Sequence, residues 1–203
     1  MAADLVTIAT TAVLSQFLGP SAKHFGEMML ERGKQVGSKA VSLLAAVGRE
    51  PQAIEPKVLL PLVQAAALET NETLSNKWAA LLANAADPIQ RVAVQPGFTE
   101  ALRQLMPVDA QILAWVYSGV TADTFQLGNE PESIMVESYA KELGLSSADF
   151  GVCMDNLLRL RLCGPRTGAF NVEQYSVVLT PAVWVVPTRF GQAFLLACAP
   201  PTT

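Results

Sequence analysis

The chain has 203 residues, of which 51% are hydrophobic and only 16% are charged, against a usual charged share of about 25%. A chain of this length and composition can bury a core without disulfide or metal support, which excludes an intrinsically disordered protein. Its 14 basic and 18 acidic side chains give a net charge of −4, so no basic excess is present to neutralise a nucleic-acid backbone.

The first predicted element is an apolar amino-terminal segment. Residues 5–22 carry no charge, but Asp4 stands where a signal peptide has positive charge, and several Thr, Ser and Gln residues interrupt the run. We therefore expect a cytoplasmic protein whose first helix packs or self-associates. Insertion of this helix into a membrane is the alternative.

An amphipathic helix is predicted from Ser21 to Val47, where apolar residues alternate with charged ones at helical spacing. A mid-helix glycine costs about 1 kcal/mol relative to alanine. Close packing against another helix, in this chain or in a second copy, would repay that cost, whereas the alternative is a run of merely tolerated glycines. The candidate self-association residues are Gly19, Gly26, Gly33 and Gly37.

Two further helices are predicted in the amino-terminal half. One begins near Pro56, which suits a first helical turn, and the other follows Asn71, a favourable N-cap residue. The segment from Asp87 to Gly97 holds two prolines and a glycine, so it is predicted to be a linker. The predicted domains are a helical region, residues 1–95, and a second region, residues 96–203.

The second region is predicted to contain four helices before its strands. Pro107 and Asp109 suit the first turn of the second helix, and Ser146 with Asp149 suits the start of the fourth. A loop is expected over residues 119–133. The helices are expected at Thr99–Leu105, Pro107–Ser118, around Ile134–Leu143 with Gly144 at its end, and from Ser146 to Leu160.

Two apolar runs, Tyr175–Leu179 and Val183–Val186, predict a small β-hairpin, and a last helix follows Thr188. Helices followed by a hairpin are typical of a winged helix. The sequence thus predicts a mainly α protein, with an amino-terminal helical region and a winged-helix-like region carrying a small β-hairpin.

A winged helix raises the hypothesis of DNA binding through the helix that starts at Ser146. The first turn of that helix offers Ser147, Ala148 and Asp149, and none of these is a usual reader of base edges. Contact with an acidic partner or a solvated surface is therefore favoured over nucleic acid. The candidate cations are Arg159, Arg161 and Arg166.

The residues offer little for catalysis or cofactor binding. His24 is the sole histidine, and Cys153, Cys163 and Cys198 form no CxxC pair, so zinc sites with histidine and the usual nucleophilic triads lack their components. Neither GxGxxG nor a Walker motif occurs. We expect no enzyme, no cofactor, no metal and no small-molecule substrate.

The segment from Pro56 to Asp87 resembles the signature of the bacterial abortive-infection alpha (Abi-alpha) family. That family has a proline-marked helix, an alanine-rich segment and a helix of the form W-A-x-L-L-A-N-A. The last motif is matched here by Trp78, Ala79, Leu81, Leu82, Ala83, Asn84 and Ala85. Further matches downstream include Pro96 and Phe98, Leu105 to Pro107, Asp155 to Leu157, and Phe190-Gly191 with Phe194 and Cys198.

The resemblance implies a role in bacterial defence against phage and supplies no reaction. Asn84 is the polar residue within the motif, and we interpret it as capping or bridging within the helix, with a ligand contact as the alternative. We therefore expect a non-enzymatic interaction protein whose partner is protein, including itself. The alternatives are a winged-helix transcriptional regulator and a membrane-acting effector.

Overall fold

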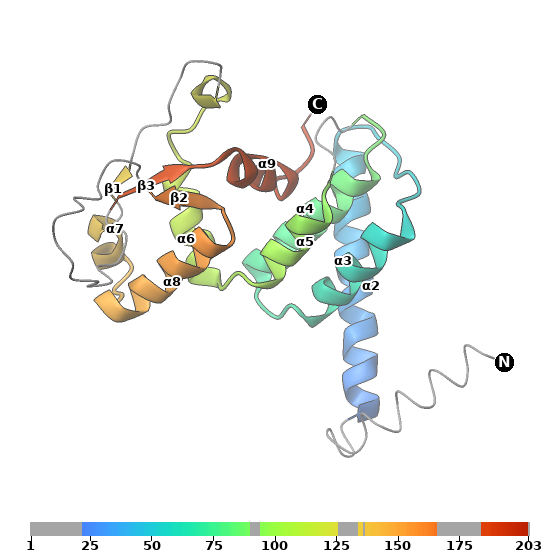
Figure 1. Cartoon of the computed structure of the whole chain (residues 1–203). Helices are drawn as coiled ribbons and strands as arrows, with labels where there is room; N and C mark the ends of the chain where they lie inside the picture. Colours follow the sequence, from blue (N-terminus) through green and yellow to red (C-terminus); the bar gives the residue numbers. More distant parts are fainter. Residues whose placement is uncertain (1–21, 90–93, 126–133, 136, 166–183, 203) are drawn as a thin grey trace, which may run out of the picture. The chain divides into compact units, whose positions relative to one another are not determined.

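The computed structural model describes residues 22–89, 94–125, 134–135, 137–165 and 184–202 (Figure 1). The protein is mainly helical with a small antiparallel sheet, as predicted. The helices and strands are α2 (Ala22–Ala46), α3 (Pro56–Leu68), α4 (Glu72–Ala86), α5 (Pro96–Arg103), α6 (Pro107–Val116), the 3₁₀ turn η2 (Ala122–Phe125), β1 (Ile134–Met135), α7 (Glu137–Glu142), α8 (Ser147–Arg159), β2 (Cys163–Pro165), β3 (Trp184–Pro187) and α9 (Arg189–Ala197).

The chain divides into two compact units. The first comprises Met1–Pro88 with Pro201–Thr203, and the second comprises Ile89–Pro200. Helix α5 already begins at Pro96, so the last two residues of the predicted linker are helical. The predicted apolar amino-terminal helix lies outside the described residues. Of the loop predicted over residues 119–133, only residues 119–125 are described, and Ala122–Phe125 form the turn η2.

The first unit is built by packing α2 and α3 against α4. Small side chains let α2 and α4 approach, because Ala40 and Leu44 of one helix share a buried cluster with Ala83 and Ala86 of the other. Asn71 caps α4 as predicted, since its side chain accepts a hydrogen bond from the Leu74 amide at 3.1 Å. These contacts explain why the alanine-rich sequence forms a helical core.

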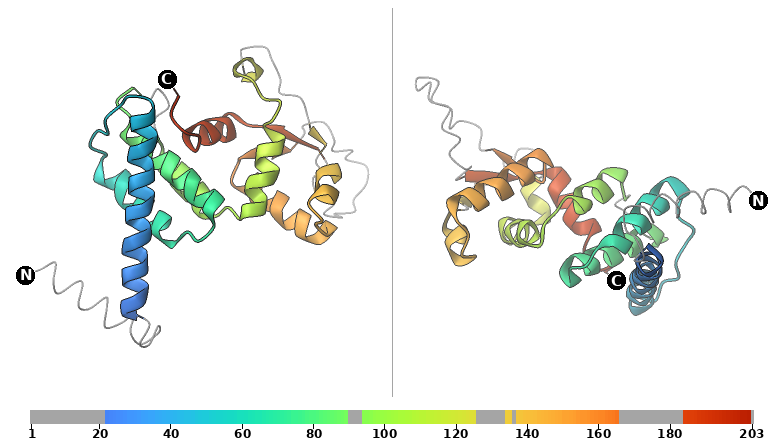
Figure 2. Two further views of the ribbon diagram at one scale, coloured as in Figure 1. Left: turned by 180° about the vertical axis from the view of Figure 1, so that it is seen from behind. Right: turned by 90° about the horizontal axis from the view of Figure 1, so that it is seen from below.

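The amino-terminal half of α2 extends past the ends of α3 and α4 (Figures 1 and 2). Side chains there are correspondingly exposed, with Leu30 at 62%. Among the described helices, none combines the length and apolar character needed to cross a membrane.

The second unit contains a three-stranded antiparallel sheet in the order β1-β3-β2. In this sheet Ile134 pairs with Val185, and Gly164 pairs with Val186. The prediction that Ile134 starts a helix is therefore wrong, because Ile134 and Met135 form the edge strand β1 and the helix begins at Glu137. The predicted hairpin partner, Tyr175–Leu179, lies outside the described residues.

Local capping sets the ends of the helices in the second unit. Ser146 caps α8 as predicted, because its hydroxyl oxygen accepts a hydrogen bond from the Asp149 amide at 3.1 Å. Thr188 caps α9 in the same way through the Gly191 amide at 2.9 Å. Gly144 follows α7 with φ +67°, a left-handed conformation that glycine adopts without strain.

The Tyr117 hydroxyl ties together the end of α6, the start of β2 and the start of α9. It donates toward the carbonyl oxygens of Leu162 at 2.7 Å and Thr188 at 3.1 Å, and it accepts from the Thr188 amide at 2.8 Å. A Cβ at Gly191 would overlap both the Tyr117 hydroxyl and the Leu162 carbonyl oxygen. The residue at 191 must therefore be glycine for this junction to close.

We predict that Gly191→Ala destabilises the protein by about 1–3 kcal/mol, the usual cost of overpacking a closed site. Gly119→Ala is the matched control, because a Cβ there would meet nothing within 4 Å. Chemical denaturation of both variants, followed by far-UV circular dichroism, measures the difference. Equal unfolding midpoints for the two variants would show that the Tyr117 junction is not tight in solution.

Candidate functional site

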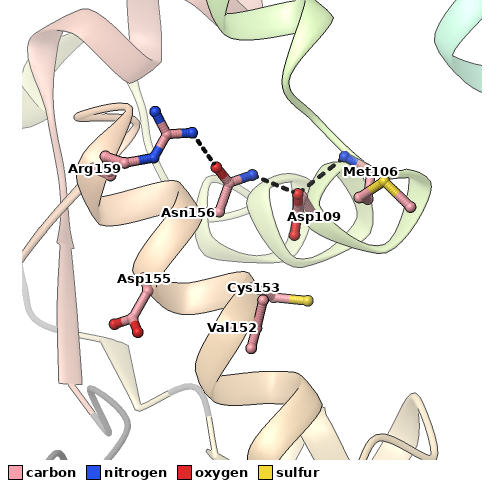
Figure 3. A pocket seen from close by; sticks show the side chains of 7 residues that line it. All are labelled: Met106, Asp109, Val152, Cys153, Asp155, Asn156 and Arg159. Carbon is pink, nitrogen blue, oxygen red and sulfur yellow. Dashed lines mark hydrogen bonds between the residues drawn. The ribbon is translucent and has the colours of Figure 1, made fainter.

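A shallow, open pocket of about 350 Å³ lies between the start of α6 and one side of α8. Figure 3 shows Asp109 of α6 facing the α8 side chains Cys153 and Asn156, while the Asp155 carboxylate points away from it. The pocket is lined by Met106, Asp109, Val152, Cys153, Asp155, Asn156 and Arg159.

Asp109 stands at the third position of α6, where a carboxylate complements the positive end of the helix dipole. Only 1% of the residue is exposed. Its Oδ2 atom accepts two hydrogen bonds, from the Met106 amide at 2.9 Å and from Asn156 Nδ2 at 2.8 Å. One carboxylate oxygen thus caps α6 and also joins α6 to α8.

Asn156 extends this network to the carboxyl end of α8. Its Nδ2 also donates to the Gln104 carbonyl oxygen at 3.0 Å, and its Oδ1 accepts from Arg159 at 2.7 Å. Arg159 donates in turn to Gln104 Oε1 at 2.6 Å. The amide orientation of Asn156 is therefore fixed by charged partners on both of its sides.

The other carboxylate oxygen, Asp109 Oδ1, is buried without a hydrogen-bond partner among the described residues. Burial of such an acceptor normally costs about 1–3 kcal/mol. The Cys153 thiol lies beside this carboxylate (Figure 3). Burial, followed by a side-chain hydrogen bond to Asp109 and the charge of that carboxylate, raises the pKa of Cys153 to about 12. The thiol therefore stays protonated at neutral pH, where it is a poor nucleophile and only a weak hydrogen-bond donor.

The rim of the pocket is apolar and exposed. Met106 is 62% exposed on the α6 side, and Val152 is 70% exposed on the α8 side. Large apolar side chains this open are informative when they border a concave site with a polar group at its base. The pocket therefore combines an apolar entrance with a buried negative charge.

The predicted cation cluster is only partly described. Arg159 is held by Gln104 and Asn156, and Arg161 is exposed with φ +58° while its carbonyl oxygen accepts from the Thr188 hydroxyl at 2.6 Å. Arg166 lies outside the described residues. No group of three or more potential metal ligands occurs in the described ranges.

Three of the four candidate self-association glycines, Gly26, Gly33 and Gly37, lie on the described helix α2. A Cβ added at Gly26, Gly33 or Gly37 would meet nothing within 4 Å in the described part of the chain. Among the described elements, none of these three glycines therefore packs closely against another helix of the same chain. Gly19 lies outside the described residues.

The motif residues behind the family resemblance are core residues. Trp78, Leu81 and Asn84 are buried in the first unit, and Leu82 is half-buried against the cluster that joins α2 to α4. Downstream, Phe98 of α5 packs against Phe190 and Phe194 of α9, with ring centroids 5.3 Å and 6.1 Å apart. These positions carry the fold and do not line the pocket.

Sequence reasoning missed the pocket, although it placed Asp109 in the first turn of α6. An acidic residue at a helix start is commonplace, so its burial was not visible in the pattern. The unusual signal was Asn156, a polar residue one position away from the apolar Leu157 on a strongly amphipathic helix.

We predict slow chemical labelling of Cys153 in the folded protein. With a pKa near 12, about one thiol in ten thousand is ionised at pH 8, roughly a thousandfold less than in an unfolded chain. Site-resolved mass spectrometry after brief alkylation measures the rate, and Asp109→Asn should increase it. Equal rates at Cys153 in native buffer and in urea would contradict a buried thiol.

The raised pKa of Cys153 also makes the stability of the fold depend on pH. A group whose pKa is higher in the folded state stabilises the fold below its unfolded pKa, near 9 for a thiol, and this contribution is lost as the pH rises toward 12. Burial also raises the pKa of Tyr117 and that of Cys163 to about 12. The free energy of unfolding is therefore expected to fall between about pH 9 and pH 12.

Comparison with known proteins gives one clear relation. No match was found among curated proteins or among solved structures. The profile of the abortive infection alpha family, in contrast, matches residues 30–198 and so covers most of both units. The chain belongs to the abortive infection alpha family, which indicates a defence role of the abortive-infection type.

Proposed function

We propose that this protein is a non-enzymatic interaction protein of a bacterial phage-defence system, acting in the cytoplasm. It recognises a protein partner through the outward face of α8. One observation carries the proposal: Val152, in the middle of that face, is 70% exposed, and the exposed carboxylates of Asp149 and Asp155 stand on either side of it.

The second unit is proposed to be a winged-helix domain. In support, helix α6, strand β1, helices α7 and α8, and strands β2 and β3 follow one another in that order along the chain. The antiparallel sheet has β3 between β1 and β2. In DNA-binding proteins of this type, the helix that corresponds to α8 enters the major groove.

The charges on α8 favour protein over DNA. A groove-binding helix needs cations toward phosphate and amide or guanidinium groups toward base edges. Asp149 and Asp155 would instead meet phosphate with like charge, and Arg159 at the end of the helix already donates to Gln104 and Asn156. The exposed positions of α8 are Ser147, Ala148, Asp149, Val152, Asp155 and Arg159.

Protein–protein interfaces have an apolar centre and a polar rim. Val152 and Met106 border the same pocket and together extend the apolar surface from α8 to α6. Family membership supplies the defence context. Recognition of a partner during infection would then couple this surface to the protective response.

We predict that Val152→Glu abolishes phage protection without unfolding the protein, because the substituted side chain lies in solvent. Ala114→Glu, which adds the same charge at an exposed position of α6, is the control and should protect fully. The measurement is the plating efficiency of phages on cells that express each variant. Undiminished protection by the Val152 variant would exclude this face as the binding surface.

DNA binding is tested on the purified protein. If the outward face of α8 binds protein, we expect no salt-dependent binding of the purified protein to duplex DNA. Salt-dependent binding that is lost when Arg159, Arg161 and Arg166 are replaced by alanine would favour a transcriptional regulator instead.

Self-association through α2 is the second part of the proposal. Its support is the protruding half of α2, where Leu30 is 62% exposed and where Gly26 and Gly33 leave room for a closely packed helix. A second copy of the same helix would bury this surface in a symmetric contact.

We predict that Gly33→Leu lowers the molecular mass in solution to that of a monomer, because the leucine blocks close approach of two helices. The monomer itself should not be destabilised, since no atom of the described residues lies within 4 Å of a Cβ at this position. Sedimentation equilibrium measures the mass, with Ser42→Leu on the exposed surface of the same helix as control. An oligomer that survives Gly33→Leu rules out this interface.

A further inference from the structure

We propose that the pocket between α6 and α8 receives the side chain of a lysine from the partner protein, with its ammonium group bound to Asp109 Oδ1. This inference rests on the proposed function and specifies the chemistry of the partner. It follows from an orphaned acceptor, the shape and lining of the pocket, and the charge of the surrounding unit.

The first observation is that one carboxylate oxygen of Asp109 is an unused hydrogen-bond acceptor. Asp109 is 1% exposed, and its Oδ1 has no hydrogen-bond partner within the described ranges. A buried acceptor without a partner is rare in folded proteins, and the group that satisfies it can come from a ligand. Because this oxygen belongs to a carboxylate, a cationic donor would gain more from it than a neutral one.

The lining of the pocket matches a long side chain with a charged tip. A lysine has four methylene groups that favour apolar surroundings and an ammonium group that requires acceptors. The exposed side chains of Met106 and Val152 provide the apolar entrance, and the carboxylate lies beyond them (Figure 3). A volume of about 350 Å³ is at the lower end for ligand sites and suits one side chain.

The single carboxylate oxygen of Asp109 that is still available favours lysine over arginine. Arginine binds a carboxylate best through two parallel hydrogen bonds to both oxygens. Here Oδ2 is already occupied by the Met106 amide and by Asn156 Nδ2. Only one oxygen is left, which suits one N–H of an ammonium group while its other two N–H groups remain hydrated in the open pocket.

The charges around the pocket are compatible with a cation. Residues 98–203 carry 6 basic and 10 acidic side chains, which attracts a basic segment over a distance. Among the described residues, Arg159 is the one cation that lines the pocket, and its guanidinium group is bound to Gln104 and Asn156. The ammonium group therefore enters from the side of Met106 and Val152.

Entry requires a small local movement, because Oδ1 is covered in the structure without a partner among the described residues. Met106 is suited to that movement, since methionine has three rotatable side-chain bonds and this one is 62% exposed.

The test uses the full chain labelled with ¹⁵N and titrated with blocked Gly-Lys-Gly, at constant ionic strength. Matched peptides carry arginine, Nε-acetyl-lysine or norleucine in place of lysine. We expect saturable amide shifts at residues 106–109 and 152–156, with the lysine peptide binding more tightly than the other three.

Two variants locate the contact. Asp109→Asn preserves an oxygen for Met106 and Asn156 but removes the charge, and it should weaken the lysine peptide by about tenfold or more. Glu142→Gln is its matched control, because it removes the same charge from the second unit at an exposed position of α7 that does not line the pocket, and it should leave the affinity almost unchanged. Val152→Tyr covers the entrance from an exposed position and should block binding even if Asp109→Asn does not fold.

Several results would overturn the assignment: no saturable shifts, equal affinity of the lysine and norleucine peptides, or equal losses in the Asp109 and Glu142 variants. The last result would indicate diffuse attraction by net charge alone. If the peptide titration fails while Val152→Glu still abolishes phage protection, the lysine assignment falls and the interaction function stands.

Discussion

The second unit depends on one buried carboxylate. Asp109 caps α6 through the Met106 amide and binds α8 through Asn156, with both hydrogen bonds made by the same oxygen. Removing such an acceptor leaves buried donors unpaired, which costs more than the hydrogen bonds contribute in net terms. Together with the buried apolar side chains Phe150, Met154 and Leu157 of α8, this contact sets the position of the helix and of its outward face.

The same carboxylate connects the fold to the proposed function. Oδ2 joins the two helices, whereas Asp109 Oδ1 has no hydrogen-bond partner of ordinary geometry among the described residues, and the Cys153 thiol beside this carboxylate is a weak donor. The exposed Val152 and Met106 border the pocket that contains it. On the proposed account, structural and binding roles share one side chain, with one oxygen assigned to each.

Chemical reactivity contributes little to this account. The Cys153 thiol in the pocket has a pKa raised to about 12, which leaves almost no thiolate at neutral pH. The pocket therefore offers binding contacts, namely an apolar rim and a fixed charge, and its cysteine is not an effective nucleophile. Membership of the abortive infection alpha family gives these contacts a defence setting.

Much of the local structure could be predicted from the sequence, because it is determined by neighbours in the chain. The Asn71 and Ser146 caps and the helix end before Gly144 are confirmed. Strands β1 and β2 were missed since they are two and three residues long, too short for alternation to be visible. They are strands because β3 lies between them, which is a long-range constraint.

The candidate site was beyond sequence reasoning for the same reason. Its lining comes from residues 106–109 and 152–159, which meet only after the unit has folded. The sequence indicated that Asp109 begins a helix, but it carried no sign that one oxygen would be buried without a partner among the described residues. The glycine stripe is the opposite case, because its pattern is visible in the sequence but the contact proposed for it involves a second copy of the chain.

The central claim is that the outward face of α8 binds a protein. The most direct measurement places a photo-crosslinking amino acid at position 152 in the full chain, with one at the exposed position 118 as reference, in cells undergoing infection. The account predicts a cross-link from position 152 alone, into one polypeptide segment that contains a lysine near the attachment point. Cross-linking to DNA, or equal yields from both positions, would contradict it.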